Sequence, residues 1–513
     1  MVDTHFSSQD LSFLATGLCL CVFSLVLFLK GKSKWALAVL ILGGFSFRLM
    51  MVFIDPFVHI WDEQFHALVA KNMTNDFFRP VLVANSVDTA LSPSYWVFTD
   101  TWLHKPPLFL WQMATAIKLF GATVWAIRIP TAVLSVLMIP AIYRCGKITG
   151  SERTGFIAAL LLTCSNIQIN IVSGWLNTDH NDAVFAYYVF FSLWSWMEYI
   201  HSGKTKWIIF MACFSAAAVL TKWLPGLLVF GVAGVVQFLF YDNRNSRKGW
   251  LKLLLAFAVA LCIAAPWFIY AATTWPAQWS ATMDHYTTHL HSSMEHGGAW
   301  WYHFDQLREQ NGWWLVIALV ISLFIFINGK TNGQIKAGLL TALVAVYGFY
   351  SFTATKMPFF CFPVMPLLIL IVAFGIDRVI ELFKRKTPAM LFGSLAIIFF
   401  TINIGRLEHY HTSRDPKEFY RKTRIHNREV FERVAKKLPP NTVIFNCGSW
   451  NAVPCMFYTG FTAYDDYPGR EQLEEAKRQK RPVAVFLEEG TANFLIPGYE
   501  VIQIREPLIR NGF

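Results

Sequence analysis

Long apolar runs separated by short polar loops fill residues 1–405 of the chain. Each run is close to the about 20 apolar residues that a helix needs to cross a bilayer. The runs are continuous rather than alternating in polarity, and helices satisfy their backbone polar groups internally in lipid, so the pattern predicts helices. We count about twelve spans on this basis. They lie at 11–29, 35–54, 124–144, 155–172, 183–200, 207–221, 224–240, 250–270, 313–328, 336–353, 357–375 and 388–405.

The loops between the runs differ in charge, and this difference predicts how the chain is threaded. Lys and Arg concentrate in short loops such as 30–34 and 384–386, which is typical of cytoplasmic loops. Alternation then places the segments 55–123 and 271–312 outside. In the first of them, residues 61–73 have the spacing of an amphipathic helix at the membrane interface, and residues 106–121 are expected to lie flat on the outer surface.

The composition changes after about residue 405, where the apolar runs end. Segments with the character of short strands and charged helices alternate through 406–513. This alternation predicts a small C-terminal α/β domain, and the threading makes it extracytoplasmic. Cys447 and Cys455 fall within it. They form a disulfide or stay free thiols, and an oxidising compartment favours the first alternative.

Composition agrees with a polytopic membrane protein. Of the 513 residues, 55% are hydrophobic and only 15% are charged, against about a quarter charged in soluble domains. The net charge of +11 resembles that of nucleic-acid-binding proteins. Its concentration in the short loops points to membrane topology instead, so no nucleic-acid partner is expected.

Asp62 and Glu63 follow the second predicted span directly, at the expected outer face. A carboxylate there can act as a general base towards an incoming nucleophile. Two acidic residues can equally cap the following helix. Only one of two neighbouring side chains normally faces a site, which leaves the second as a cap or a ligand.

Three lysines lie near prolines at predicted outer positions, against the usual preference of positive charge for the inside. They are Lys105, Lys222 and Lys356. Such a cluster of ammonium groups suits a phosphate or pyrophosphate group. The alternative for each is a lysine that extends its charge to the lipid headgroups.

Asp182 begins the fifth span from the outside, where a cap and a catalytic role are equally open. The segment 271–312 is rich in Trp and His, as in an interfacial aromatic belt. Its histidines are a candidate metal site, although their spacing follows no strong metal motif. They are His285, His289, His291, His296 and His303.

The order of these motifs resembles the GT-C superfamily of glycosyltransferases. The Asp-Glu pair after an early span, the Lys-Pro-Pro segment some forty residues later, the Thr-Lys pair at mid-chain and the late Lys-Met-Pro segment all recur. The similarity is greatest to the branch of the protein O-mannosyltransferases and the aminoarabinose transferase of lipid A. It covers residues 35–375.

The resemblance implies a role for each matching residue. Asp62 matches the essential acidic residue, a catalytic base or a group that orients the acceptor. Lys105 matches the lysine that contacts the lipid phosphate. Asp182, Lys222 and Lys356 match charged positions that line the cavity. Glu63 is expected beside this site.

Three further positions bear on the resemblance. His296 precedes an aromatic pair as a histidine does in the aminoarabinose transferase. His104 stands where relatives often carry Glu, which puts any metal bound there in doubt, and Phe360 replaces a tyrosine. One extra span precedes the shared region.

The resemblance implies transfer of a sugar from a polyprenyl-phosphate donor to a lipid, glycan or protein acceptor, with inversion, at the outer face of a bacterial plasma membrane. The membrane lipid is the other partner. No cofactor is expected to be required, and a divalent metal stays open. A secondary transporter would show repeated halves with broken helices at the midplane. A polyprenyl-lipid flippase would use the lysines without Asp62.

Overall fold

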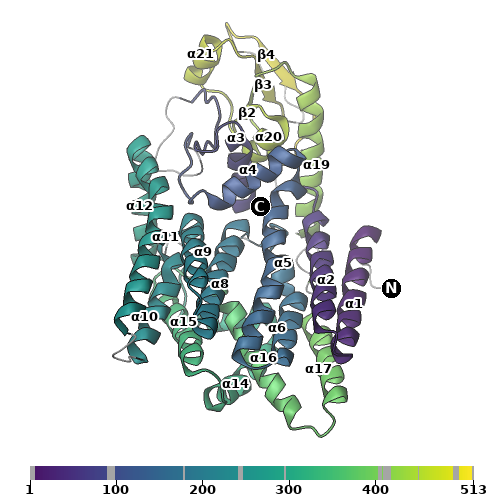
Figure 1. Ribbon diagram of the computed structural model, residues 1–513. Helices are drawn as coiled ribbons and strands as arrows, with labels where there is room; N and C mark the ends of the chain where they lie inside the picture. The colour runs from purple at the N-terminus through teal and green to yellow at the C-terminus, as the bar shows by residue number, and fades with distance from the viewer. Residues whose placement is uncertain are drawn as a thin grey trace.

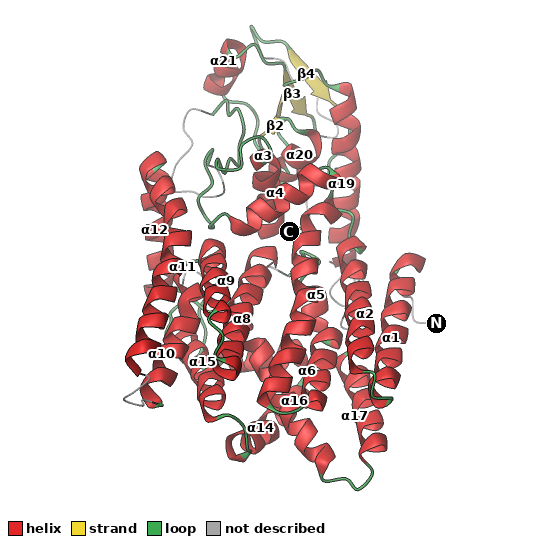
Figure 2. Ribbon diagram, viewed as in Figure 1, coloured by secondary structure: helices red, strands yellow, loops and turns green. Residues whose placement is uncertain are grey.

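The computed structural model consists mainly of helices that run side by side, with a small sheet at one end (Figures 1 and 2). The structure describes residues 6–88, 97, 99–176, 179–240, 246–293, 296–402, 407, 417–448, 450–488 and 496–510.

The membrane part is a bundle of helices. They are α1 (Ser8–Leu29), α2 (Ser33–Phe53), α5 (Val124–Thr149), α6 (Glu152–Cys164), α7 (Asn166–Asn170), α8 (Asp179–Ser202), α9 (Lys206–Lys222), α10 (Leu228–Leu239), α11 (Ser246–Thr274), α14 (Trp313–Asn328), α15 (Gly333–Phe352), α16 (Met365–Glu381) and α17 (Lys386–Thr401). Polar caps begin several of them. The Ser7 hydroxyl accepts from the backbone of Asp10 in α1, and Ser151 does the same for Thr154 in α6.

These helices lie where the apolar runs predict, but the count of spans is not confirmed. Among the described residues, six helices are long and apolar enough to cross a membrane, or up to seven with one bent pair. Two of the remaining runs are divided. Residues 155–172 break at Ser165 between α6 and α7, and 224–240 begins with the 3₁₀ turn η1 (Leu224–Leu227) at Pro225. Proline removes a backbone donor and ends a regular helix, so an apolar run can exceed the helix it contains.

Four helices stand outside the bundle. They are α3 (Asp62–Met73), α4 (Leu108–Phe120), α12 (Pro276–His291) and α13 (Tyr302–Asn311). Helices were predicted at the first two positions, but α3 lacks the polar face expected of an interfacial helix. Every residue from Glu63 to Ala70 is buried. Other parts of the chain cover α3 on all sides, so it does not lie on a lipid surface.

The end of the chain forms a four-stranded parallel sheet. Its strands are β1 (Val443–Phe445), β2 (Thr462–Ala463), β3 (Val483–Phe486) and β4 (Val501–Ile504), in the order β2-β1-β3-β4. Three helices, α19 (Lys417–Lys437), α20 (Ala452–Thr459) and α21 (Arg470–Arg478), accompany the sheet. Figure 1 shows this unit beside α3 and α4, above the bundle.

The sheet unit shares its hydrophobic core with the segment 55–123. Phe65 of α3 and Phe109 of α4 belong to one buried cluster with Phe431 of α19, Met456 of α20 and Phe486 of β3. A domain boundary normally has few contacts across it. The upper part of the molecule is therefore built from two distant stretches of the chain, and α3 is its shared centre.

Candidate active site

Asp62 and Glu63 begin α3, and the backbone before them has an unusual conformation. Trp61 has a φ of 66° and a ψ of −132°. Bulky residues rarely adopt positive φ, and such positions are frequent at functional sites. The two neighbouring carboxylates diverge from this turn. Asp62 is half-buried, whereas Glu63 is fully buried.

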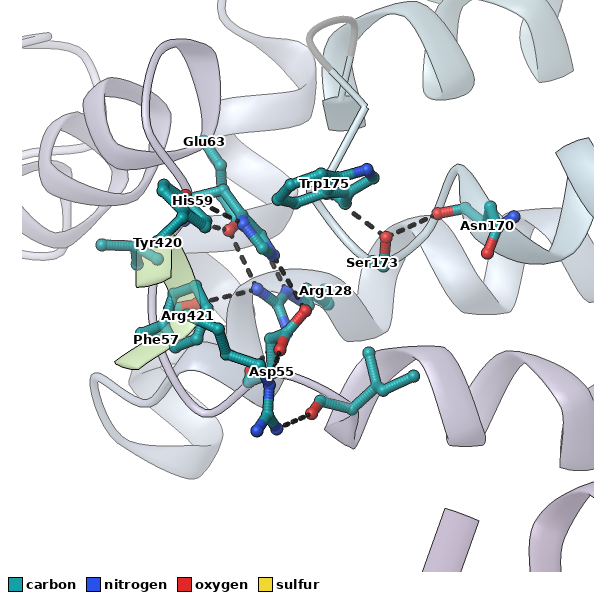
Figure 3. Close-up of polar contacts among 12 residues, drawn as sticks. Asp55, Phe57, His59, Glu63, Arg128, Asn170, Ser173, Trp175, Tyr420 and Arg421 are labelled. Carbon is teal, nitrogen blue, oxygen red and sulfur yellow. Dashed lines mark hydrogen bonds and ion pairs between the residues drawn. The ribbon is translucent and has the colours of Figure 1, made fainter. Parts of the chain in front are cut away.

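Glu63 forms a buried ion pair with Arg128 of α5 (Figure 3). The Arg128 Nε donates to Glu63 Oε1 at 2.7 Å, and its Nη2 donates to Oε2 at 2.9 Å. His180 of α8 contacts Oε1 at 3.1 Å, and the backbone N–H of His59 donates to Oε2 at 2.7 Å. Both carboxylate oxygens are therefore engaged inside the protein.

The charge of Glu63 is maintained despite its burial. Burial alone raises the pKa of Glu63, but the charge and hydrogen bonds of Arg128, with that of His180, hold the pKa well below its usual range. The Arg128 guanidinium also donates to the carbonyls of Asp55 and Phe57 at 2.8 and 2.9 Å. These bonds tie the loop after α2 to α5.

We call this group the closed cluster, consisting of Asp55, His59, Glu63, Arg128 and His180. Burial lowers the pKa of His59, against the effect of its hydrogen bond to Asp55. A Cβ added at Gly174 would overlap the Glu63 carboxylate. The cluster thus leaves no room for a substrate group at Glu63. The residue predicted beside the active site instead anchors the turn that carries Asp62.

A second polar group forms around Tyr286 of α12. Lys222, at the end of α9, makes an ion pair with Asp182 of α8. Burial raises the pKa of Tyr286, and the charges of Lys222, Asp182 and Asp62 all act on the same hydroxyl. Three residues predicted for one site, from α3, α8 and α9, are therefore within electrostatic range of one phenol.

The segment with His104 and Lys105 reaches the same place. The Tyr286 hydroxyl donates to the His104 carbonyl at 2.5 Å, and the ring of His104 lies 5.0 Å from that of His285. Burial lowers the pKa of His285, and the charge of Lys105 lowers it further. We call the set of Asp62, Lys105, Asp182, Lys222 and Tyr286 the open cluster.

The two clusters differ in exposure. The side chains of Arg128 and Glu63 are 0% exposed, whereas those of Lys222 and Asp182 are 18% and 15% exposed. The open cluster combines carboxylates with ammonium groups, and its ion pair is partly exposed. This is the composition expected for acid–base chemistry beside a phosphate.

Lys356 lies close by but is engaged elsewhere. Its ammonium group donates to the carbonyls of Tyr350, Ser351 and Thr353 at 2.9, 2.7 and 2.6 Å. These acceptors are at the end of α15, where carbonyls lack helical partners. Burial lowers the pKa of Lys356. A phosphate would have to displace these bonds, so the structure gives Lys356 a capping role.

His296 is exposed, and its backbone carbonyl accepts from the backbone N–H of Lys356 at 2.6 Å. Phe360 contacts both Lys222 and Tyr350, whose carbonyl accepts from Lys356. Its ring is 4.7 Å from that of Tyr350 and 5.2 Å from the Lys222 ammonium. Phe360 thus makes a cation–π contact with Lys222.

Two residues of these clusters are not singled out by the sequence. Arg128 lies within a predicted apolar span, although a charged group at membrane depth is itself a signal of function or pairing. Tyr286 stands among many aromatic residues in 271–312, and nothing in its neighbours distinguishes it.

The described residues contain no group of three or more His, Cys, Asp or Glu side chains that could hold a metal ion. The side chain of His289 lies outside the described part of the chain. Cys447 and Cys455 are buried free thiols in this structure. Burial raises the pKa of Cys447, and the neighbouring Cys455 raises it further.

Known proteins resemble the chain in sequence. Residues 104–270 match the family described as dolichyl-phosphate-mannose-protein mannosyltransferase. The putative mannosyltransferase YycA of Bacillus subtilis (strain 168) is 24% identical over 47% of this chain and 33% of its own length. An undecaprenyl phosphate-alpha-4-amino-4-deoxy-L-arabinose arabinosyl transferase of Pseudomonas savastanoi pv. phaseolicola is 24% identical over 55% of this chain and 52% of its own. The chain spans between a third and about half the length of these relatives.

Solved structures resemble it over a larger part. ArnT from Cupriavidus metallidurans, bound to undecaprenyl phosphate, gives a TM-score of 0.66 over 88% of this chain and 90% of that chain, at 16% identity. The archaeal oligosaccharyltransferase AglB from Archaeoglobus fulgidus, in complex with an inhibitory peptide and a dolichol-phosphate, gives 0.53 over 85% and 65%, at 11% identity.

These similarities confirm the resemblance predicted from the motifs. The chain is an integral membrane protein with the fold of the GT-C glycosyltransferases. Within that class, the structural likeness to ArnT is more extensive than the likeness to AglB, which agrees with the branch expected from the sequence.

Proposed function

We propose that the chain transfers a sugar from a polyprenyl-phosphate donor to an acceptor on the extracytoplasmic side of the membrane. The observation that carries the proposal is the open cluster. Lys222 forms an ion pair with Asp182, and the Tyr286 hydroxyl, which feels the charges of this pair and of Asp62, donates to the carbonyl of the residue before Lys105. The fold supports it, because the solved ArnT structure holds undecaprenyl phosphate.

In the proposed reaction, the acceptor hydroxyl attacks the anomeric carbon of the sugar. A bond forms from the hydroxyl oxygen to that carbon while the bond from the carbon to the phosphate oxygen breaks. The hydroxyl proton passes to Asp62, which acts as the general base. One displacement inverts the configuration, and the leaving group is the polyprenyl phosphate.

Lys105 and Lys222 supply positive charge to the leaving phosphate. Lys222 is paired with Asp182, so this carboxylate sets the position of the ammonium and tempers its charge. We assign Asp182 a positioning role on this ground. Lys356 is outside the phosphate set, because three carbonyls hold its ammonium group. It fixes the end of α15, where Tyr350 also experiences the charge of Asp182.

The proposed orientation places α3, α4, α12 and the C-terminal sheet outside a bacterial plasma membrane. It rests on the basic loops, which mark the opposite end of the bundle as cytoplasmic. In Figure 1, α3, α4 and the sheet occupy one end of the molecule together. A donor would enter from the outer leaflet, and a lipid, glycan or protein would supply the acceptor hydroxyl.

The test is transfer by the purified full-length protein. It is incubated in lipid nanodiscs with a panel of polyprenyl-phosphate sugars and candidate acceptors, and the products are analysed by mass spectrometry. We expect sugar loss from at least one donor by the wild type and none by Asp62→Ala. Transfer by Asp62→Ala at the wild-type rate would contradict the role of Asp62. Movement of intact donor between leaflets without release of sugar would favour a flippase.

A further inference from the structure

The C-terminal helix α19 holds the turn that carries Asp62. Residues 420, 421, 424 and 428 of α19 lie on one face of the helix. Three arginines on this face donate to the loop after α2 or to the first turn of α3. Arg421 Nε donates to Asp55 Oδ1 at 2.9 Å, and Arg428 Nη1 donates to the Pro56 carbonyl at 2.6 Å. Arg424 Nη2 donates to the Gln64 side chain at 3.0 Å.

Tyr420 contacts the two residues just before Trp61. Its hydroxyl accepts the backbone N–H of Ile60 at 3.1 Å and lies 3.1 Å from Nδ1 of His59 (Figure 3). The ring is 7% exposed and stacks on that of His59. The His59 Nε2 faces Asp55 Oδ2 at 3.4 Å. When the imidazole proton is on Nε2, Nδ1 of His59 accepts a hydrogen bond from the Tyr420 hydroxyl. The hydroxyl oxygen then accepts the N–H of Ile60.

The turn from His59 to Gln64 is therefore held by several hydrogen bonds. The Gln64 N–H donates to the His59 carbonyl at 3.2 Å, and the His59 N–H donates to Glu63 at 2.7 Å. Tyr420 holds Ile60, and the residue that follows is Trp61, with its positive φ of 66°. A backbone in such a conformation persists when its surroundings determine it.

We propose that Tyr420 is a positioning residue for the transfer reaction, which fixes the Ile60–Trp61 backbone so that the Asp62 carboxylate faces the open cluster. The inference rests on the proposed function for its kinetic part only. It gives the C-terminal segment a defined task, since the residue that orients the base comes from α19 and not from the membrane bundle.

The chain offers a matched control. The Tyr464 hydroxyl accepts the backbone N–H of Val87 at 2.9 Å and lies 3.0 Å from the Ser86 hydroxyl. Both tyrosines thus join the C-terminal segment to the segment 55–123 through a backbone amide and a side chain. Only Tyr420 does so beside Asp62. Replacing either tyrosine with Phe removes one hydroxyl and leaves one backbone N–H without its hydrogen-bond acceptor.

The experiment compares Tyr420→Phe and Tyr464→Phe in the full-length protein. We expect Tyr420→Phe to lower kcat by about 10-fold, because small displacements of a catalytic group have large effects on rate. The KM for the donor should stay within about 2-fold, since Lys105 and Lys222 are untouched. Tyr464→Phe should keep the wild-type kcat. Equal losses of kcat in both variants would mean general destabilisation and overturn the inference.

Hydrogen exchange gives a readout that does not depend on activity. In Tyr420→Phe, the peptide containing Ile60 should exchange faster than in the wild type, while the peptide containing Val87 is unchanged. Tyr464→Phe should give the reverse pattern. If the wild type transfers no sugar from any donor, the proposed function fails but this measurement still decides about Tyr420. Unchanged protection of Ile60 in Tyr420→Phe would overturn the inference.

Discussion

Asp62 and Glu63 are consecutive in the chain, and the structure places them in two opposite environments. Glu63 lies in the closed cluster, where Arg128, His180 and a backbone amide occupy both of its oxygens. Asp62 lies in the open cluster, whose ion pair between Lys222 and Asp182 remains partly exposed. One carboxylate holds the turn, and the other is half-buried and is the one that we propose for catalysis.

The difference has a physical origin in solvation. A charge removed from water requires a partner with good geometry, and a buried pair is weakened severely when one partner is lost. A partly exposed pair can exchange its partner for a ligand at lower cost. The comparison therefore predicts that substitutions in the closed cluster affect folding, whereas substitutions in the open cluster affect catalysis and binding.

The largest effect is expected from Glu63→Gln. It leaves the Arg128 guanidinium charged and unpaired in the core, which should lower the free energy of unfolding by about 3–5 kcal/mol. We expect little monodisperse protein in size-exclusion chromatography and a strongly lowered Tm.

The control is Glu152→Gln, the same substitution in an ion pair of similar length. Glu152 is 48% exposed and lies 2.9 Å from Lys147. Exposed pairs contribute less than about 1 kcal/mol, so this variant should fold normally. A wild-type Tm for Glu63→Gln would remove the distinction between the clusters.

The second effect in size is expected from Asp62→Asn. The amide cannot accept the acceptor's proton, and loss of a general base lowers rates by about 10²–10⁴-fold. The Tm should stay close to that of the wild type, because Asp62 is only half-buried and the Asn side chain keeps its size. A large fall in Tm with this variant would place Asp62 in the closed cluster instead.

Much of this arrangement follows from local patterns in the sequence. Apolar runs located the helices of the bundle, and the Asp-Glu pair marked the start of α3. The lysines were harder to assign. Lys222 and Lys356 both precede a proline by a few residues, yet one pairs with Asp182 and the other caps α15. Helix-end carbonyls accept from lysine as readily as a phosphate does, so the pattern alone does not separate the two roles.

The remaining features depend on contacts between distant residues. Arg128 meets Glu63 across 65 positions, and Tyr420 meets Ile60 across 360. The polar side of α3 is expected to face solvent, but α19 and α20 cover it. Arg424 of α19 donates to Gln64, and Lys71 donates to two carbonyls of α20. Such pairings depend on the tertiary arrangement, which a local pattern in the sequence does not predict.

A smaller effect is expected from Tyr286→Phe, within the open cluster. The variant loses the hydroxyl that donates to the His104 carbonyl. The segment with Lys105 is then held less firmly, so the KM for the donor should rise by about 10-fold with a lesser change in kcat. Kinetics at varied donor concentration check this. Tyr270→Phe, at a 39% exposed tyrosine of α11, is the control and should leave KM unchanged. A fall in kcat alone would show that Tyr286 acts at the chemical step.

The smallest expected effect tests the geometry of the open cluster without any substrate. Burial lowers the pKa of His285, and the positive charge of Lys105 lowers it further, because a nearby cation disfavours a second one. Lys105→Met removes the second cause and keeps the first. The pKa of His285 should therefore rise towards its ordinary value by a fraction of a unit, as followed by NMR titration of the labelled imidazole. The control is Lys118→Met. Lys118 lies on α4 over the ring of Phe77, and its replacement should leave the pKa of His285 unchanged. A constant pKa in Lys105→Met would place the ammonium away from His285, and the open cluster would lose its proposed phosphate ligand while the closed cluster stayed intact.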